Sequence, residues 1–429
     1  MHRYVDALWS YRAALALNAD RSDTWTNLGN SLTTLKQFKS AIICHERAIA
    51  LSPREDPVLH HNLGVSLCKA GRHADAVAAF TRALEIKPDY HPARWDRALA
   101  HLYLGNYREG WADYEVRLVS GQVPKRSPPG NKWDGAPYPG KRLLLLAEQG
   151  FGDMLWTARY LPRVKALGGE LIVECRRELV PLIESMDVAN RVIARGDKLP
   201  SADLHCYICS LPGLFTPDLD AIPSAPYLCA PTDRLAKFRP LFERAVGALK
   251  VAIVWSGSVT FGNNRDRAHV LMRFLQSFAI PGVQLYSLQK GPPERELAAL
   301  PKGSPIIDLS PHIADFADTG AAVAQLDLVI MTDSAVAHLA GAMGKPVWLL
   351  LGQSPHWLWL LERTDIPWYP TLRLFRSSGS DWDTAFDAAS AELMELAKPQ
   401  FAAAVPANRF ESPAPKLARN LALSPAKAR

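Results

Sequence analysis

A repeated pattern of small and apolar residues runs through the first part of the chain and restricts its fold more than any other feature. One segment carries Leu28, Gly29, Ala41, Ala48 and Pro53, and the next carries Leu63, Gly64, Ala76, Ala83 and Pro88. A third unit contains Ala98, Gly110 and Tyr114, and a half unit at the start is marked by Ala7, Tyr11 and Ala14. Repeats of roughly 34 residues are typical of stacked helix pairs. The pattern predicts an all-α solenoid over residues 1–120, made of three and a half units.

The repeat resembles the TPR motif. Small residues at these positions let paired helices approach closely, and each unit buries its apolar stripe only against its neighbour. The helix that opens the array would then be covered either by an upstream segment or by another chain. TPR arrays usually offer a concave groove to a protein or peptide partner. The alternative is that the array only extends and stabilises the domain that follows it.

Proline and glycine punctuate residues 121–140, which we expect to form a linker. Beyond it, a buried strand at Arg142–Ala147 leads into a helix at Asp153–Leu167, and a second strand follows at Glu170–Glu174. A strand, a glycine-rich turn and a helix in this order open a βαβ unit. The pattern predicts a first α/β lobe over residues 141–235.

The same alternation resumes in the second half of the chain. Buried strands are expected at Lys250–Trp255, Gln284–Leu288, Leu326–Met331 and Pro346–Leu351. They predict a second lobe over residues 250–397. The predicted fold class is therefore α/β, with two doubly wound Rossmann-like lobes behind the helical solenoid. Ligands of such folds bind at the carboxyl ends of the strands, so the functional site should lie in the cleft between the lobes.

Composition argues against several classes of protein. The chain is 48% hydrophobic and 21% charged, and it has no apolar run near the ~20 residues that cross a bilayer. Its formal charge of +6 comes mostly from residues 398–429, whose basic residues outnumber a single acid and whose proline and alanine content predicts disorder. A basic folded surface is therefore not expected, which argues against a nucleic-acid partner. No leader-like apolar segment follows Met1, so a cytoplasmic location is expected.

The six cysteines are scattered along the chain, unlike the dense framework of a small secreted domain. Cys206 and Cys209 form a CxxC motif, but no second pair or histidine lies at metal-ligand spacing. The residues that flank this motif are those of an apolar strand. Buried structural cysteines are therefore favoured over a redox or zinc site.

The segment Met331–Pro346 passes from a buried strand through a polar turn into a helix with small residues on one side. Asp333 or Ser334 can cap that helix, and His338 lies one turn inside it. A helix start presents N–H groups and a partial positive charge, both of which suit a diphosphate. The alternative is an ordinary capped helix with a packed histidine.

Several further motifs accompany this turn, and they are spread over most of the chain. They are Gly105-Asn-Tyr-Arg-Glu-Gly-Trp-Ala-Asp-Tyr-Glu115, Glu148-Gln-Gly-Phe-Gly-Asp153, Val254-Trp-Ser-Gly257, Asp333-Ser334 with His338-Leu-Ala-Gly341, and Pro367-Trp-Tyr-Pro370 with Leu374-Phe-Arg376. In combination they resemble the family-9 glycosyltransferases, which include the lipopolysaccharide heptosyltransferases, and more closely their TPR-linked relatives. The resemblance implies the two-lobed GT-B fold, with the donor mainly on the C-terminal lobe. It also implies transfer from a nucleoside-diphosphate sugar with inversion, without a bound metal or other cofactor.

The resemblance also assigns roles to individual residues. Asp153, which follows Gly150 and Gly152 on the first turn, matches the general base that takes a proton from the acceptor hydroxyl. The alternative is an ordinary acid at a helix start, favoured there by the helix dipole. Glu294 lies where heptosyltransferases place a carboxylate for the nucleoside, and a carboxylate at that place could accept hydrogen bonds from ribose hydroxyls.

The remaining donor roles fall on two segments of the second lobe. Asp333, Ser334 and His338 match the donor-phosphate turn. Arg265 or Arg267 could neutralise charge on the departing diphosphate, the role that a metal would otherwise fill. The alternative for these two arginines is a solvated basic loop.

Two departures from the family pattern bear on activity. TPR-linked relatives tend to have Asp-Trp-Arg-Trp where this chain has His356-Trp-Leu358-Trp359, and Arg-Ser where it has Arg267-Ala268. Loss of a cleft arginine could alter the acceptor or weaken phosphate binding. The leading hypothesis is a glycosyltransferase whose TPR repeats recruit a partner or the acceptor, which is a glycan, a lipid-linked molecule or a protein. The rival hypotheses are a protein O-glycosyltransferase that uses a UDP-sugar, and an inactive scaffold that kept the fold.

Overall fold

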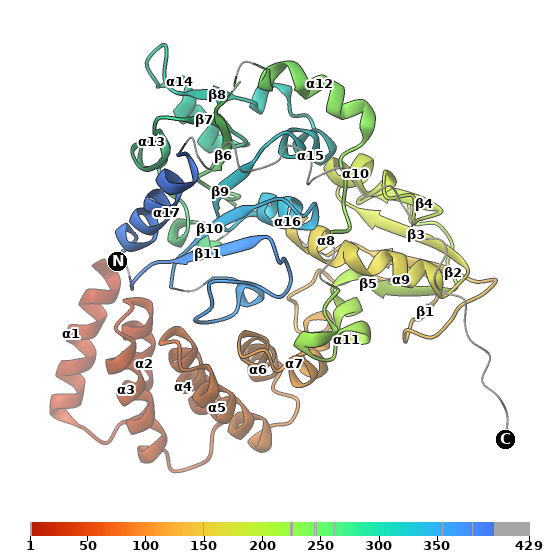
Figure 1. The fold of residues 1–429 in the computed structure, drawn as a ribbon. Coiled ribbons are helices and arrows are strands. Elements are labelled where there is room, and N and C mark those ends of the chain that lie inside the picture. The colour runs from red at the N-terminus through yellow and green to blue at the C-terminus, as the bar shows by residue number, and fades with distance from the viewer. Residues whose placement is uncertain are drawn as a thin grey trace, which may run out of the picture.

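A helical array leads into two parallel sheets in the computed structural model of the chain (Figure 1). The structure describes residues 2–148, 150–223, 226–243, 245, 247–260, 262–353, 355–379 and 381–398. The predicted tail at 398–429 therefore lies outside the described residues, except for Lys398. Among the helices of the described part, none is both long and apolar enough to cross a membrane.

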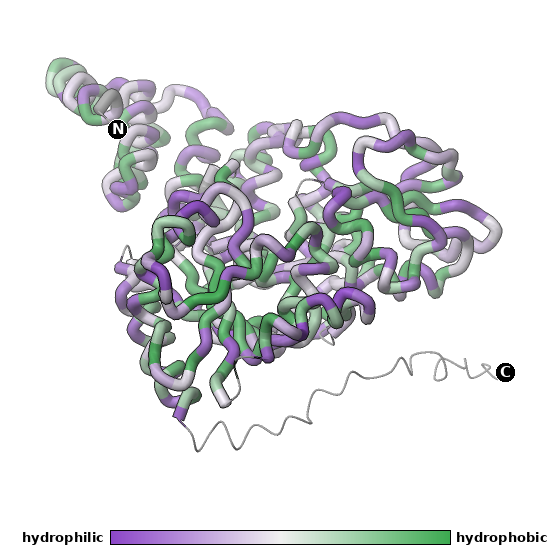
Figure 2. Tube along the Cα trace, turned by 90° about the horizontal axis from the view of Figure 1, so that it is seen from above, coloured by the Kyte–Doolittle hydropathy of each residue, from purple (hydrophilic) through white to green (hydrophobic). Residues whose placement is uncertain are grey.

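Seven helices form the N-terminal array. They are α1 (His2–Leu17), α2 (Ser22–Thr34), α3 (Phe38–Leu51), α4 (Pro57–Lys69), α5 (His73–Ile86), α6 (His91–Tyr103) and α7 (Tyr107–Tyr114). Ala41 and Ala76 are fully buried, as the repeat pattern predicts. A Cβ atom on Gly29 would lie 2.6 Å from the ring of His45, so only glycine lets these paired helices approach this closely. The predicted helical solenoid is confirmed, and Figure 2 shows its first helices extending from the two lobes as an arm.

The last helix pair of the array is fixed to both lobes. Trp111 of α7 donates its indole N–H to the carbonyl of Thr216 in the first lobe, at 2.9 Å. Tyr107 of the same helix accepts a hydrogen bond of 2.7 Å from the indole of Trp368 in the second lobe. Arg117, just after α7, forms a buried ion pair with Glu148. Because these partners belong to both lobes, the end of the array forms part of their core.

The first lobe contains a five-stranded parallel sheet with the order β1-β5-β2-β3-β4. Its elements are β1 (Asn131–Lys132), β2 (Arg142–Leu146), α8 (Phe151–Thr157), α9 (Leu161–Ala166), β3 (Glu170–Cys175), α10 (Val180–Glu184), β4 (Arg191–Ala194), β5 (Leu204–Tyr207) and α11 (Leu211–Phe215). The prediction of a linker over 121–140 needs correction, because β1 lies within it. Trp133 and Tyr138 from the same segment are buried in the core. Their large apolar rings anchor the segment despite its proline and glycine content.

The first lobe also departs from the predicted doubly wound arrangement. Leu143 and Leu145 of β2 face the cluster that contains the buried residues of α8 to α11. Leu144 and Leu146 face the opposite way and pack with side chains from loops and strand ends, among them Leu199 and the neighbouring Ala202. The chain returns from β4 to β5 without a helix, so in the described residues the helices of this lobe cover one face of the sheet.

The second lobe contains a six-stranded parallel sheet with the order β11-β10-β9-β6-β7-β8. Its elements are α12 (Thr232–Phe242), β6 (Leu249–Val254), α13 (Leu271–Phe278), β7 (Val283–Ser287), α14 (Arg295–Ala298), β8 (Ile306–Asp308), α15 (Phe316–Ala324), β9 (Leu328–Thr332), α16 (Ala335–Ala342), β10 (Val347–Leu351), β11 (Leu372–Arg376) and α17 (Asp383–Leu396). Val251 and Ile253 pack with α13 and α17, whereas Ala252 and Val254 join the cluster that holds α15 and α16. Helices therefore cover both faces, as predicted for this lobe.

The order in which the parallel strands are added to this sheet reverses between β6 and β9. Strands β7 and β8 are added in turn on one side of β6, and β9, β10 and β11 are added in turn on its other side. A crevice forms at such a reversal because the connecting segments diverge there. The segments that follow β6 and β9 are therefore the expected places for ligand-binding residues.

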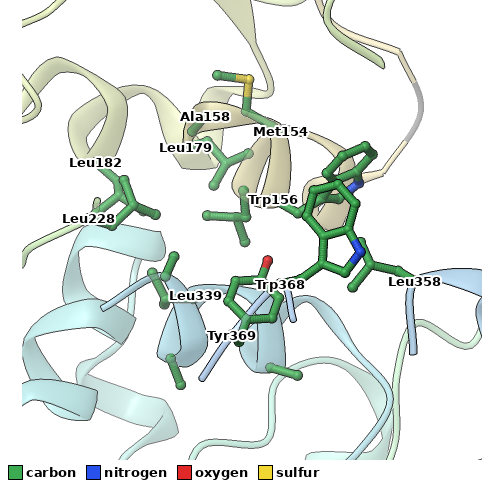
Figure 3. Close-up of a cluster of buried hydrophobic side chains, with 14 of the residues drawn as sticks. Met154, Trp156, Ala158, Leu179, Leu182, Leu228, Leu339, Leu358, Trp368 and Tyr369 are labelled. Atoms are coloured by element: carbon green, nitrogen blue, oxygen red, sulfur yellow. The ribbon is translucent and has the colours of Figure 1, made fainter. Parts of the chain in front are cut away.

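The two lobes share one hydrophobic core at their junction. Trp156 of α8 packs against Trp368 of the second lobe, with ring centres 5.4 Å apart. Trp156 and Met154 belong to the same hydrophobic cluster as Leu339 of α16 and Tyr369, and Figure 3 shows these side chains between the two lobes. This shared core places α8 directly against α16.

Candidate functional site

The turn between β9 and α16 carries polar groups that the protein does not satisfy. Ser334 occupies the N-cap position of α16, but its side chain makes no capping hydrogen bond. Its hydroxyl is buried without a partner, as is that of Thr332 at the end of β9. The predicted capping by Asp333 or Ser334 is therefore wrong in the described residues, because the Asp333 carboxylate lies instead 3.4 Å from Arg267. An uncapped helix start beside two buried hydroxyls fits an anionic ligand.

Arg267 is held in place by the segment that follows β6. A Cβ atom on Gly257 would lie 2.8 Å from the Arg267 guanidinium and 2.9 Å from the amide oxygen of Asn264. The same Asn264 oxygen accepts a hydrogen bond from the Gly257 N–H at 3.1 Å. Glycine is therefore required for this close approach. Arg265, by contrast, is exposed and forms no ion pair with any carboxylate in the described residues.

Glu294 lies further along the same edge of the sheet, after β7. One oxygen of its carboxylate is 3.8 Å from the Lys290 ammonium group and is buried without a hydrogen-bond partner. Strands β9, β6 and β7 are successive neighbours, and neighbouring strands lie roughly 4.8 Å apart. The structure shows no direct bond from Glu294 to Arg267 or Asp333. A ligand that reached all three would have to extend across three strands.

The turn before α8 brings the first lobe to the same place. Asp153 lies in the first turn of α8, and its carboxylate accepts a hydrogen bond of 2.9 Å from the N–H of Gly150. A Cβ atom on Gly152 would lie 3.0 Å from the His338 ring. The predicted residues of the two lobes, far apart in the sequence, therefore meet across Gly152 and His338.

His338 is a neutral, packed histidine. Its Nδ1 lies 3.0 Å from the hydroxyl of Tyr369, and its ring stacks on Trp359 with centres 5.0 Å apart. Burial lowers the pKa of His338 to about 3, an effect that Asp333 opposes. At neutral pH the imidazole is uncharged, so it contributes hydrogen bonding and shape to the site.

Three residues near the lobe junction were not predicted from the sequence. Arg159 is buried, and its guanidinium lies 4.8 Å from the Trp368 ring centre and donates to the Trp368 carbonyl at 3.1 Å. Tyr103 of α6 donates a 2.5 Å hydrogen bond to the carbonyl of Pro355, in the segment after β10. Lys36 of the array pairs with Asp266, next to Arg267, at 2.8 Å. These residues are far from the predicted site residues in the sequence, and no motif connects them with the site.

Leu358, which stands where relatives tend to have an arginine, lies inside the protein. Leu358 is fully buried in the hydrophobic core at the lobe junction, and it is labelled near Trp368 in Figure 3. Its side chain is therefore part of the core.

Cys206 and Cys209 are buried and form no disulfide. In the described part of the chain, no group of three or more histidine, cysteine or acidic residues could hold a metal ion.

Three buried histidines predict how stability depends on pH. Burial lowers the pKa of His45 and of His73 to about 4, and that of His338 to about 3, from 6.5. The unfolded state binds more protons than the folded state below pH 6.5, so stability falls as the pH drops from 7 to 5. Each histidine is expected to cost about 1.4 kcal/mol at one pH unit below 6.5. Urea unfolding at pH 7, 6 and 5 measures this loss.

The carboxylate of Glu115 does not contribute to the loss of stability expected between pH 7 and pH 5. Burial raises the pKa of Glu115, but the charge of Arg117 and the hydrogen bonds with Lys132, Ser210 and Arg117 outweigh it and lower this pKa to about 2. The stability from that group is lost only below its ordinary pKa of 4.5. Replacing His45 with phenylalanine should flatten the pH dependence, and an unchanged urea midpoint between pH 7 and pH 5 in the native chain would contradict the assignment.

Most of the comparisons with known proteins concern the helical array. Residues 22–55 and 57–90 each match a family model described as tetratricopeptide repeat. The Peroxisomal targeting signal receptor of Eremothecium gossypii is 33% identical over 98 residues, which cover 23% of this chain and 17% of that protein. Among solved structures, MamA is 24% identical and covers 28% of this chain and 69% of its own, with a TM-score of 0.26.

One relative matches far beyond the repeats. Protein FlbA of Caulobacter vibrioides is 30% identical over 414 residues, which cover 87% of this chain and 67% of FlbA. A match of this extent includes the two lobes as well as the array. The chain therefore belongs to the family of Protein FlbA, and its N-terminal segment is a tetratricopeptide-repeat array.

Proposed function

We propose that the protein is an inverting, metal-independent glycosyltransferase of the GT-B type. It transfers a sugar from a nucleoside-diphosphate donor to an acceptor hydroxyl, and its TPR array recruits the acceptor or a partner protein. The observation that carries the proposal is the contact between α8, whose first turn holds Asp153, and α16, whose preceding turn places Asp333 beside Arg267. These turns supply the two chemical functions that such a transfer needs.

The donor side is the turn before α16. Arg267 supplies a fixed positive charge, and the first N–H groups of α16 point away from the helix with no side-chain cap. Together with the unpartnered hydroxyl of Ser334 they form a site for a diphosphate. Charge that develops on the departing diphosphate would be stabilised there by groups already in place.

The acceptor side is the turn before α8. The N–H of Gly150 fixes the Asp153 carboxylate at the start of the helix. A positioned carboxylate can take the proton from an acceptor hydroxyl as that oxygen attacks the sugar. Inversion requires the attacking oxygen and the leaving diphosphate to lie on opposite faces of the anomeric carbon, and a base and a phosphate site on different lobes are compatible with that requirement.

The array would present a bound partner near this cleft. Lys36 and Tyr103 hold the array against segments that follow β6 and β10. Because these contacts fix the array relative to the second lobe, a protein or acceptor bound on the array would be delivered to a constant place. A glycan, a lipid-linked molecule or a protein fits this scheme.

The burial of Leu358 favours one alternative function. An arginine at this position in relatives would bring a positive charge, whereas Leu358 lies in the apolar core. A non-catalytic scaffold that kept the fold and lost phosphate binding would show this change. A protein O-glycosyltransferase that uses a UDP-sugar is the other alternative, and a polypeptide acceptor would identify it.

Nucleotide binding tests the proposal. Purified protein is titrated with UDP, ADP, GDP and their sugar conjugates, and the melting temperature is followed, because a ligand that binds the folded state raises it. We expect one base to be preferred. Replacing Arg267 with glutamine should weaken that binding about 10- to 100-fold, since a charge-assisted hydrogen bond contributes roughly 1.5–3 kcal/mol.

The neighbouring Arg265 provides the matched control. It is exposed and lies two residues away, so Arg265→Gln should leave nucleotide binding unchanged. The melting temperature of each variant without ligand shows whether folding is intact. The absence of any nucleotide-induced shift, or an equal loss in both variants, would count against the donor site and favour the scaffold.

A further inference from the structure

A polar cavity lies on the first lobe, lined by residues outside the turns described above. It has a volume of about 660 Å³. Arg176 and Arg177, which follow β3, and Arg195, which follows β4, line one side of it, and the segment 121–124 lines the other. The cavity is therefore built jointly by the sheet of the first lobe and by the segment that leaves the TPR array.

Basic residues outnumber acidic ones around this cavity. Three arginines line it, against Glu178 in the lining and Asp197, which pairs with Arg177 at 3.0 Å. Arg195 is half-buried and forms no ion pair with a carboxylate in the described residues.

Two other half-buried arginines have carboxylate partners. Arg97 pairs with Asp113, and Arg126 pairs with Glu174. An arginine side chain that is held at a cavity wall without such a partner is suited to an anion from outside. The planar guanidinium group matches the oxygens of a carboxylate or a phosphate.

The cavity adjoins the proposed acceptor side of the cleft. The Arg176 guanidinium lies 4.9 Å from the centre of the Phe151 ring, and Phe151 is two residues before Asp153. Strands β2, β3 and β4 are parallel neighbours, so their carboxyl ends share one edge of the sheet. The volume of the cavity falls in the usual range for small-molecule sites, about 300–1,000 Å³.

We propose that this cavity binds the carboxylate or phosphate group of an anionic sugar acceptor and holds the sugar beside Asp153. The inference rests on the proposed function, because it names the class of acceptor for that same cleft. Arg177 and Arg195 contact the anion, and a neutral sugar gains nothing from them. Specificity for charged acceptors thus follows from two strand ends next to the turn that carries the base.

Calorimetric titration with simple sugars tests the inference. Glucose 6-phosphate and glucuronate are the charged probes, and glucose is the neutral one. We expect one or both charged sugars to bind at least tenfold more tightly than glucose, and their relative affinity shows whether phosphate or carboxylate is preferred. The double replacement Arg177→Gln and Arg195→Gln should remove that advantage.

The control is Arg191→Gln, at the opposite end of β4, which is exposed and should leave binding unchanged. A titration of Arg267→Gln, in which the donor turn is weakened, should give the same affinity for the charged sugars as the native chain. Because Arg177 and Arg195 lie outside the core, the variants should melt at the native temperature, and Arg195→Lys provides a milder second test.

Three results would overturn the inference: charged sugars that bind no better than glucose, charged sugars that bind the double variant as tightly as the native chain, or binding that is lost in Arg267→Gln. If nucleotides bind and charged sugars do not, this inference fails while the proposed donor site stands. If charged sugars bind and no nucleotide does, the anion site stands while the proposed function fails.

Discussion

Replacing Arg117 with methionine is expected to destabilise the protein by about 3–5 kcal/mol, the cost of leaving a buried partner charge unpaired. The Arg117 side chain is 1% exposed and that of Glu148 is 4% exposed. Two hydrogen bonds, of 2.9 and 2.8 Å, join the guanidinium to the Glu148 carboxylate. This pair links the end of the array to the strand end before Asp153, so its loss should lower the urea midpoint of the whole domain.

Two variants separate the charge effect from simple loss of contacts. The double replacement Arg117→Met and Glu148→Leu removes both charges and should recover part of the loss, because an apolar pair tolerates burial. Some cost remains, since Glu148 also accepts a hydrogen bond of 3.0 Å from the Cys209 N–H. Arg82→Met, which removes an exposed ion pair with Glu85, should leave the midpoint almost unchanged. A midpoint for Arg117→Met equal to that of Arg82→Met would contradict the account of the junction.

Replacing Asp153 with asparagine is expected to lower the rate of sugar transfer about 10²- to 10⁴-fold, the usual contribution of a positioned general base. Asparagine has the same shape and can still accept the hydrogen bond from the Gly150 N–H, so the turn should keep its structure. Nucleotide binding should therefore stay at the native level. Release of the nucleoside diphosphate from the preferred sugar nucleotide, with and without acceptor, measures the rate.

An exposed acid of the same lobe serves as the comparison. Asp220→Asn should transfer sugar at the native rate, because Asp220 is exposed and lies in the short 3-10 helix Leu219–Ala221. Equal rates for Asp153→Asn and the native chain would assign Asp153 to the ordinary role of an acid at a helix start. A parallel loss of nucleotide binding in Asp153→Asn would instead indicate damage to the lobe junction.

The helical array could be predicted from the sequence because its determinants are local. Residues such as Ala41 and Gly29 recur at a fixed period, and each is needed where two neighbouring helices touch. The strands of the second lobe were equally accessible, since both faces of this sheet are buried and the strands read as continuous apolar runs. Figure 2 shows such hydrophobic segments in the interior of the lobes.

Contacts between distant segments could not be predicted. The single helical layer of the first lobe depends on a return from β4 to β5 that has no helix, and no periodic signal marks that difference. The missing cap on α16 has a similar origin, because Asp333 turns toward Arg267, which lies in another loop. The docking of Tyr103 and Lys36 onto the second lobe likewise depends on tertiary packing alone.

The candidate site shows the same division. The types of residue and their motifs indicated Asp153, Asp333, Ser334 and His338, and the structure brings their two turns together. Of the two arginines considered, only the structure separates Arg267 from the exposed Arg265. The neutral state of His338 also became apparent only with its surroundings, since the lowered pKa arises from burial.

The most direct test of the central claim is a crystal structure of the protein grown with saturating UDP, ADP or GDP. The account predicts that one nucleotide places its diphosphate over the start of α16, within hydrogen-bonding distance of Ser334 and Arg267, and its base toward Glu294. An ordered nucleotide at another place, or no bound nucleotide in any of the three crystals, would contradict it.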